Sequence, residues 1–139
     1  MRTETTVALI VAAGQGIRAG GGIPKQYRSI GGAPILGRSL KTFLGHPRID
    51  RVLVVTGADD APHYAASAPQ HAKLLPAVAG GATRQESVRA GLESLAAVTP
   101  GRVLIHDAVR PFASAALIER VAAGLDHADA VLPALPVAD

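Results

Sequence analysis

The sequence contains no cysteine among its 139 residues, and this absence excludes several kinds of site at once. Disulfides, thiolate zinc centres and cysteine nucleophiles all require the missing side chain. Aromatic residues are also scarce, at 3%, whereas 48% of the chain is hydrophobic. The length fits one domain with a substantial core, and the apolar composition favours helices layered on a sheet over an aromatic-rich β-sandwich.

The chain also lacks a long hydrophobic run. Its first apolar run, Val7 to Ala13, is far shorter than the ~20 residues of a transmembrane helix and has no basic leader or cleavage site. We therefore expect a cytoplasmic protein with no membrane partner.

Acidic residues are missing from a long N-terminal stretch. Between Glu4 and Asp50 there is no Asp or Glu, although the formal net charge of the whole chain is only +3. The same stretch contains these basic residues: Arg18, Lys25, Arg28, Arg38, Lys41 and Arg48. A segment with only basic charges favours an anionic ligand. Because no Lys/Arg run or interleaved aromatic residue accompanies the charge, we do not expect nucleic acid as a partner.

Hydrophobic patterning predicts strands and helices in alternation. The predicted strands are residues 7–12, 51–56, 74–78, 103–106 and 130–135. The predicted helices run from Pro34 to near Gly45, over a short part of 59–70, from a Thr83 cap to about Leu95 with Val88, Leu92 and Leu95 inward, and from a Ser114 cap to Leu125. This order predicts an α/β fold: a three-layer, mostly parallel, Rossmann-like sheet with helices on both faces. We expect residues 1–139 to form one nucleotide-binding domain, interrupted at its C-terminal end.

Three segments with unusual residues follow the predicted strands. Residues 14–25 follow the first strand, 80–87 follow the third and 107–110 follow the fourth. In open parallel sheets, ligands bind beyond the carboxyl ends of the strands. We therefore expect these segments to meet on one rim of the sheet.

The first of these segments is rich in glycine and carries two cations, Arg18 and Lys25. Glycines allow successive backbone N–H groups to surround phosphate oxygens. A P-loop is excluded because the chain contains no Gly-Lys pair. The residues from Gly14 to Ala19 match the loose dinucleotide fingerprint, but Pro24 and the run of glycines before it oppose the required helix, and no acid follows at the ribose-binding spacing.

The other two segments each have an ordinary structural explanation beside the functional one. The loop before Ser87 and the helix that follows offer free N–H groups to an anion or a base, but the same pattern is also that of a simply capped helix. Asp107 ends a strand beside the predicted phosphate site and can hold Mg²⁺, or it can cap a turn or pair with Arg110. We expect His106 to be structural. The sequence contains no G-x-S-x-G motif, which argues against a serine hydrolase.

Taken together, the motifs resemble those of the 2-C-methyl-D-erythritol 4-phosphate cytidylyltransferase family. The resemblance covers residues 7–139 in the family's order and spacing. The motifs are Ala12-Ala13-Gly14-x-Gly16-x-Arg18, Pro24-Lys25-Gln26-Tyr27, Gly80-Gly81-x-x-Arg84-x-x-Ser87-Val88 and His106-Asp107-Ala108-Val109-Arg110-Pro111.

The resemblance implies a fold of the nucleotidyltransferase type. It also implies a Mg²⁺-dependent transfer of the cytidylyl group from CTP to a polyol phosphate, 2-C-methyl-D-erythritol 4-phosphate. Arg18 and Lys25 would stabilise the transition state, and Asp107 would bind Mg²⁺. The residues implied to contact the nucleotide are Ala12, Ala13, Gly14, Gly16, Gly81, Ala82, Ser87 and Ala108. The family continues past Asp139 with polyol-binding residues and a dimerisation arm, so we expect a homodimer of the full-length protein and incomplete activity of these 139 residues alone.

Three alternatives stay open at this point. Ribitol-5-phosphate cytidylyltransferase has the same chemistry and closely related motifs, although Ala12-Ala13-Gly14 and the segment 133–139 favour methylerythritol phosphate. A non-catalytic nucleotide-binding domain is the second alternative. Fusion to methylerythritol 2,4-cyclodiphosphate synthase, which occurs in some bacteria, is the third.

Overall fold

A computed structural model describes residues 4–14 and 22–138 of the chain. Its elements, in order, are β1 (Thr6–Ala12), the 3₁₀ helix η2 (Lys25–Tyr27), β2 (Ser29–Ile30), β3 (Ala33–Pro34), α1 (Ile35–Leu44), β4 (Arg51–Thr56), α2 (Ala61–Ser67), β5 (Val78–Ala79), α3 (Arg84–Ser94), the 3₁₀ helix η3 (Leu95–Ala97), β6 (Arg102–Asp107) and α4 (Ala115–Gly124). None of the described helices is long and apolar enough to cross a bilayer.

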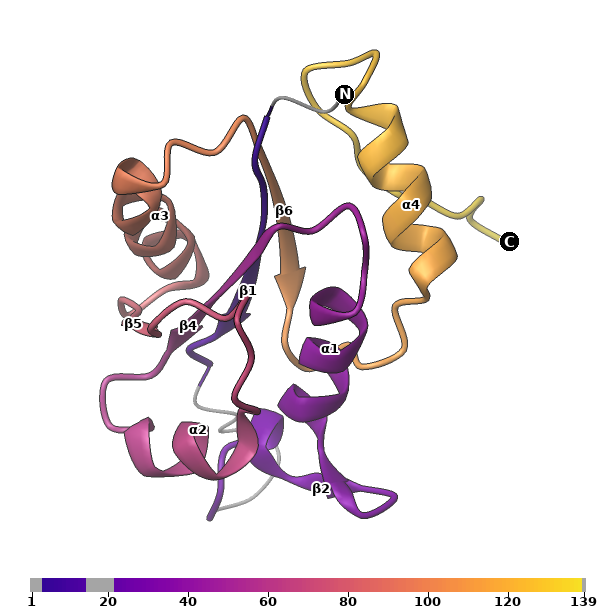
Figure 1. The fold of residues 1–139 in the computed structure, drawn as a ribbon. Coiled ribbons are helices and arrows are strands. Elements are labelled where there is room, and N and C mark those ends of the chain that lie inside the picture. The colour runs from indigo at the N-terminus through magenta and orange to yellow at the C-terminus, as the bar shows by residue number, and fades with distance from the viewer. Residues whose placement is uncertain (1–3, 15–21, 139) are drawn as a thin grey trace.

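A four-stranded sheet in the order β5-β4-β1-β6 forms the middle layer, and all its described pairings are parallel. Helix α3 covers one face, whereas α1 and α4 cover the other (Figure 1). This arrangement confirms the predicted three-layer α/β fold. The four-stranded sheet is accompanied by a separate small hairpin of β2 and β3, joined by Gly31 and Gly32.

The side chains of β1 alternate between the two faces of the sheet because successive residues of a strand point in opposite directions. Val7 and Leu9 belong to the apolar cluster that includes Leu95, on the α3 side. Ala8 and Ile10 belong to the larger cluster with the α1 residues, on the opposite side. All four are fully buried, so β1 lies at the centre of both halves of the core.

Helix α1 begins directly after Pro34, as predicted, because proline fixes a backbone angle suited to a helix start. Its buried apolar residues are Ile35, Leu36, Leu40, Phe43 and Leu44. Buried Ser39 lies on the same helix, and its hydroxyl donates to the carbonyl oxygen of Ala108 at 2.9 Å. That hydrogen bond connects α1 to the loop that follows β6.

Helix α3 approaches the sheet closely because Gly91 has no side chain. A Cβ at this position would lie 2.5 Å from Leu9 Cδ1 and 2.8 Å from Val55 Cγ2. The helix faces the sheet with Ser87, Gly91 and Leu95, at the spacing of one helical face. Leu92 is therefore turned outward and 43% exposed, so the prediction that it packs inward was wrong.

Two predicted strands also differ from the structure. The segment 74–78 pairs with β4 only at an isolated bridge, Val52 with Leu74, and at the start of the two-residue β5. Residues 130–135 form no strand. They follow α4, where a Cβ on Gly124 would lie 2.9 Å from Val131 Cγ2. No described strand supplies the backbone partners that a strand requires.

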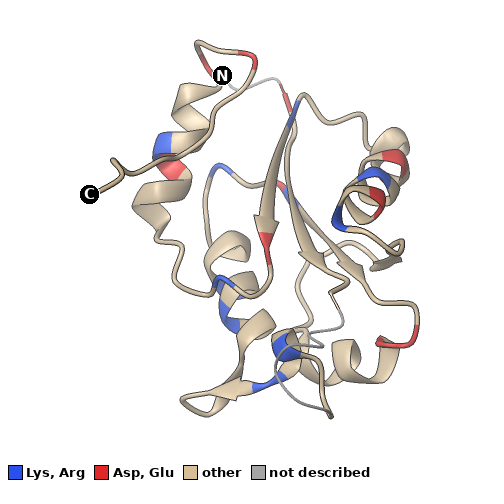
Figure 2. Cartoon of the chain, turned by 180° about the vertical axis from the view of Figure 1, so that it is seen from behind, with Lys and Arg blue, Asp and Glu red and all other residues tan. Residues whose placement is uncertain are grey.

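The described segment from η2 to the end of α1 carries Lys and Arg but no Asp or Glu, as the charge pattern of the sequence indicated (Figure 2). Several are already engaged: the guanidinium of Arg28 donates to the carbonyl of Ile23 at 2.9 Å, and that of Arg38 to Ile30 at 2.7 Å. Arg48 pairs with Glu119 at 2.8 Å and thereby ties α4 to the chain after α1. For Lys25 no ion-pair partner is found among the residues that the structure describes.

Candidate nucleotide-binding site

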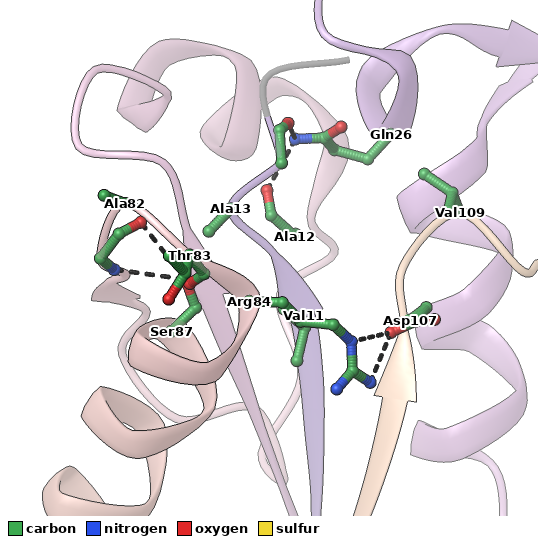
Figure 3. A pocket seen from close by; sticks show the side chains of 12 residues that line it. Val11, Ala12, Ala13, Gln26, Ala82, Thr83, Arg84, Ser87, Asp107 and Val109 are labelled. Carbon is green, nitrogen blue, oxygen red and sulfur yellow. Dashed lines mark hydrogen bonds and ion pairs between the residues drawn. The ribbon is translucent and has the colours of Figure 1, made fainter.

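A cavity of about 610 Å³ opens at the carboxyl ends of β1 and β6, beside the start of α3 (Figure 3). Its size is within the range usual for ligand pockets. The lining residues are Val11, Ala12, Ala13, Gly14, Gln26, Gly81, Ala82, Thr83, Arg84, Ser87, Asp107 and Val109. The predicted meeting of three separate segments on one rim is thus confirmed for the part of the chain that the structure describes.

The first wall of the cavity is the end of β1, and Gln26 holds it in place. The side-chain amide of Gln26 donates to the carbonyl oxygen of Ala12 at 2.6 Å and to that of Gly14 at 2.9 Å. Gln26 is only 2% exposed, so water does not compete strongly for these bonds. The η2 helix therefore fixes the backbone at the point where the glycine-rich segment begins.

The second wall is the loop before α3, and its shape depends on two hydroxyl groups. Thr83 caps the helix: its side chain accepts from the N–H of Glu86 at 3.1 Å, and the Glu86 carboxylate accepts from the N–H of Thr83 at 2.9 Å. Buried Ser87 accepts from the N–H of Gly81 at 3.2 Å and donates to the carbonyl of Thr83 at 2.9 Å. These hydrogen bonds fix the helix start and connect it to the loop before it.

A close approach brings these two walls together at Gly80. A Cβ on Gly80 would lie 2.8 Å from the Cβ of Ala13 and 2.5 Å from the hydroxyl of Ser87. Only glycine fits such a gap without a shift of the neighbouring chain.

The third wall carries the charged residue Asp107, at the end of β6. Its Oδ1 accepts from Arg84 Nη2 at 2.9 Å, and its Oδ2 accepts from Arg110 Nε at 3.3 Å. Burial on its own would raise the pKa of Asp107, but hydrogen bonds and charge from Arg84, and then from Arg110, outweigh it and hold the pKa below its ordinary value. Asp107 is therefore ionised at neutral pH.

An ionised carboxylate that lines a cavity is a suitable ligand for Mg²⁺, which binds one or two carboxylates together with water and substrate phosphates. Among the described residues no group of three or more His, Cys, Asp or Glu side chains is arranged to hold a metal. Asp107 could supply a single carboxylate ligand to such an ion, through the oxygens that here accept from Arg84 and Arg110.

His106 precedes Asp107 and lies away from this chemistry. Its Nε2 is 2.8 Å from the carbonyl oxygen of Arg110, and its ring packs on Phe43 with centroids 4.9 Å apart. Burial lowers the pKa of His106, although the Arg110 carbonyl and the Asp107 charge act against it. These contacts support the structural role predicted for this residue.

Residues 6–139 match the family model described as IspD, 2-C-methyl-D-erythritol 4-phosphate cytidylyltransferase. The chain belongs to this family.

Relatives with curated names support the same assignment. The protein named bifunctional enzyme IspD/IspF of Mesorhizobium japonicum is 49% identical over 138 residues, which cover 99% of this chain and 34% of that protein. The protein of the same name from Rhizorhabdus wittichii is 54% identical over 132 residues, covering 95% of this chain and 34% of that protein. The chain thus spans about a third of the length of these relatives.

Solved structures of the cytidylyltransferase family have the same fold. The 4-diphosphocytidyl-2C-methyl-D-erythritol synthase of Anaerococcus prevotii aligns with a TM-score of 0.72 at 29% identity, over 89% of this chain and 52% of that one. The bifunctional IspDF of Campylobacter jejuni aligns with a TM-score of 0.78 over 97% of this chain and 34% of that one, and at 24% identity it shows the fold alone.

The IspD-type site residues predicted from the sequence fall into three groups. Those that line the cavity are Ala12, Ala13, Gly14, Gly81, Ala82, Ser87 and Asp107. Lys25 is exposed and Ala108 is fully buried, and neither lines the cavity, although Gln26 and Val109 beside them do. Gly16 and Arg18 lie outside the described residues.

The sequence-based prediction gave no role to two residues that line the cavity, Gln26 and Arg84. Gln26 belongs to the Pro24–Tyr27 motif, but the resemblance gave this residue no function. No sequence signal indicates that its amide turns back to Ala12 and Gly14. Arg84 was likewise quoted without a role. Its position at the start of a capped helix that follows a strand was the signal that could have placed it on the rim.

Proposed function

We propose that the intact natural protein that contains this chain transfers the cytidylyl group of CTP to 2-C-methyl-D-erythritol 4-phosphate. The products are 4-diphosphocytidyl-2-C-methylerythritol and pyrophosphate. The observation that carries the proposal is the cavity in which the end of β1, the start of α3 and Asp107 converge, in a chain of this family.

The reaction is a substitution at phosphorus. A phosphate oxygen of the polyol phosphate forms a bond to the α-phosphorus of CTP, and the bond from that phosphorus to the bridging oxygen of pyrophosphate breaks. Both reactants are anions, so catalysis depends on positioning and on positive charge rather than on covalent help from the protein.

The predicted site residues have separate parts in this proposal. The backbone from Ala12 to Gly14, with Gly16 in the same segment, lines the phosphates and base, and Gly81, Ala82 and Ser87 complete the cytosine pocket. The buried hydroxyl of Ser87 supports the assignment of the cytosine pocket, because it accepts a hydrogen bond from the N–H of Gly81. Arg18 and Lys25 stabilise the charge that builds on the phosphoryl oxygens, and Ala108 packs behind the nucleotide.

In this proposal Asp107 would hold Mg²⁺ together with the CTP phosphates. The ion would supply positive charge to the triphosphate and orient it. The position of the Asp107 carboxylate on the cavity wall supports this part. Location in the cytoplasm and a homodimer of the intact protein stay predictions from the sequence.

We further propose that the intact protein is bifunctional, because the curated relatives of this region carry that name and are about three times as long. The mass of the natural protein and a cyclodiphosphate synthase assay test this part separately.

Pyrophosphate release by the intact protein tests the main proposal. CTP and Mg²⁺ are offered with 2-C-methyl-D-erythritol 4-phosphate, with ribitol 5-phosphate, or with no acceptor. We expect release with the methylerythritol phosphate, and little with the other two. Preferential release with ribitol phosphate would transfer the assignment to the related enzyme. CTP binding with no release from either acceptor would indicate a non-catalytic nucleotide-binding domain.

A further inference from the structure

Arg84 reaches across the cavity to the carboxylate that we assign to the metal ion. It is the first residue of α3, and its side chain extends toward Asp107 (Figure 3). Two of its nitrogens contact one carboxylate oxygen: Nη2 lies 2.9 Å and Nε 3.2 Å from Oδ1 of Asp107.

Both oxygens of Asp107 are therefore engaged by guanidinium groups, since Arg110 binds the other one. Asp107 is the one carboxylate among the described residues that line the cavity. The positive charges of Arg84 and Arg110 therefore lie beside the carboxylate that a divalent cation would need as its ligand.

A divalent cation and Arg84 compete for the same oxygen. The cation needs the lone pairs that now accept from Arg84, and its charge would be repelled by a guanidinium a few ångströms away. The ion pair that has to be broken is weak, because the Arg84 side chain is 61% exposed and that of Asp107 is 29% exposed. Exchange of Arg84 for a cation is therefore feasible.

The displaced guanidinium has a suitable new partner close by. A triphosphate in this cavity presents several anionic oxygens, and the planar fork of arginine matches phosphate geometry with paired N–H donors. Arg84 also belongs to a helix start, where backbone N–H groups favour anions. A small side-chain movement would carry its charge from Asp107 to the phosphates.

We propose that Arg84 is a placeholder for the metal ion. It neutralises Asp107 while the cavity is empty, opposes binding of a divalent cation on its own, and passes to the triphosphate when cation and nucleotide arrive together. Arg84 is thus a positioning residue that couples metal binding to nucleotide binding. This inference rests on the proposed function, because it assumes a triphosphate in the cavity.

Binding of Mn²⁺ to the intact protein without nucleotide tests the first half. Mn²⁺ replaces Mg²⁺ because its free concentration can be followed by electron paramagnetic resonance. We expect Arg84→Gln to tighten Mn²⁺ binding about fivefold or more, because one nearby positive charge is removed. Arg89→Gln is the matched control: it lies on the same helix, pairs with Glu93 at 2.8 Å and removes the same charge outside the cavity.

Unchanged or weaker Mn²⁺ binding in Arg84→Gln, with a thermal unfolding curve like that of the wild type, would overturn the proposal. The double variant Arg84→Gln/Asp107→Asn locates the ion: we expect it to lose the tightened site. If the double variant keeps tight binding, the ion is held elsewhere and the proposal fails.

Binding of CTP in the presence of Mg²⁺, measured by calorimetry, tests the second half. We expect Arg84→Gln to weaken this binding about tenfold while Arg89→Gln stays within about twofold of the wild type, because a charge-assisted contact to phosphate is lost. Equal affinity in both variants would overturn the transfer of Arg84 to the nucleotide. Neither measurement involves turnover, so a failed transferase assay and a failed Arg84 proposal give different results.

Discussion

Lys25 and Arg18 are the two residues to which the family resemblance gives catalytic roles. Lys25 is exposed at the start of η2, directly before Gln26 on the cavity wall. We expect Lys25→Ala and Arg18→Ala each to lower kcat by about 10²–10³-fold, the range found when one transition-state donor is removed. Pyrophosphate release by the intact protein measures the effect.

The control for these two variants is Lys41→Ala. Lys41 is exposed on α1 and does not line the cavity, so this substitution removes the same charge at a distance from the chemistry. We expect near-normal turnover for Lys41→Ala. The same result for Lys25→Ala or Arg18→Ala would refute the role of that residue.

The side-chain amide of Gln26 is the donor for two carbonyl groups at the end of β1. Gln26→Met keeps the volume and leaves both carbonyl oxygens without this donor. We expect the free energy of unfolding to fall by about 1–3 kcal/mol and the KM for CTP to rise. Chemical denaturation and initial rates measure the two effects.

A matched substitution at an exposed glutamine shows whether the effect belongs to the site. Gln70→Met lies in the exposed segment after α2, and we expect it to change neither stability nor KM appreciably. If Gln26→Met changes stability but leaves the KM for CTP as it was, Gln26 supports the fold and does not position the nucleotide segment.

The N-terminus of α3 shows what the local sequence can predict. Thr83 was expected to cap this helix, and the structure has the complete capping box with Glu86. We expect Thr83→Ala to lower the free energy of unfolding by about 1 kcal/mol, whereas Thr83→Ser, which keeps the hydroxyl, loses at most a few tenths. Equal stability of the two variants in urea would show that the cap does not hold the helix.

Elements with strong internal patterns could be predicted, and those that depend on distant partners could not. β1, β4 and β6 are apolar runs, and α1 and α4 follow a clear start signal, so their positions were predicted to within one or two residues. The segment 130–135 has the composition of a strand but no described neighbour to pair with.

In the candidate site, too, some features could be predicted from the sequence and others could not. Its walls could be predicted because the carboxyl ends of parallel strands share an edge. The contact between Arg84 and Asp107 joins residues 23 apart in sequence, so it depends on how α3 packs against the sheet. No spacing rule predicts such a contact.

The cavity is formed by parts of the chain that are far apart in sequence. A ligand that contacts the end of β1, the start of α3 and Asp107 together binds the folded state and not the unfolded one. We therefore expect CTP with Mg²⁺ to stabilise the intact protein by about 2.7 kcal/mol at a hundredfold excess over Kd. Thermal unfolding with and without the ligand measures this shift.

Metal removal separates the contribution of Asp107 from that of the rest of the cavity. We expect CTP with EDTA to give a smaller shift in Tm than CTP with Mg²⁺, because the triphosphate then lacks its link to the carboxylate. Asp107→Asn, which keeps the shape of the side chain, should show the smaller shift under both conditions. If Mg²⁺ still increases the shift in Asp107→Asn by the wild-type amount, the metal ion is held by the nucleotide or by other residues, and the third wall of the cavity has no part in binding it.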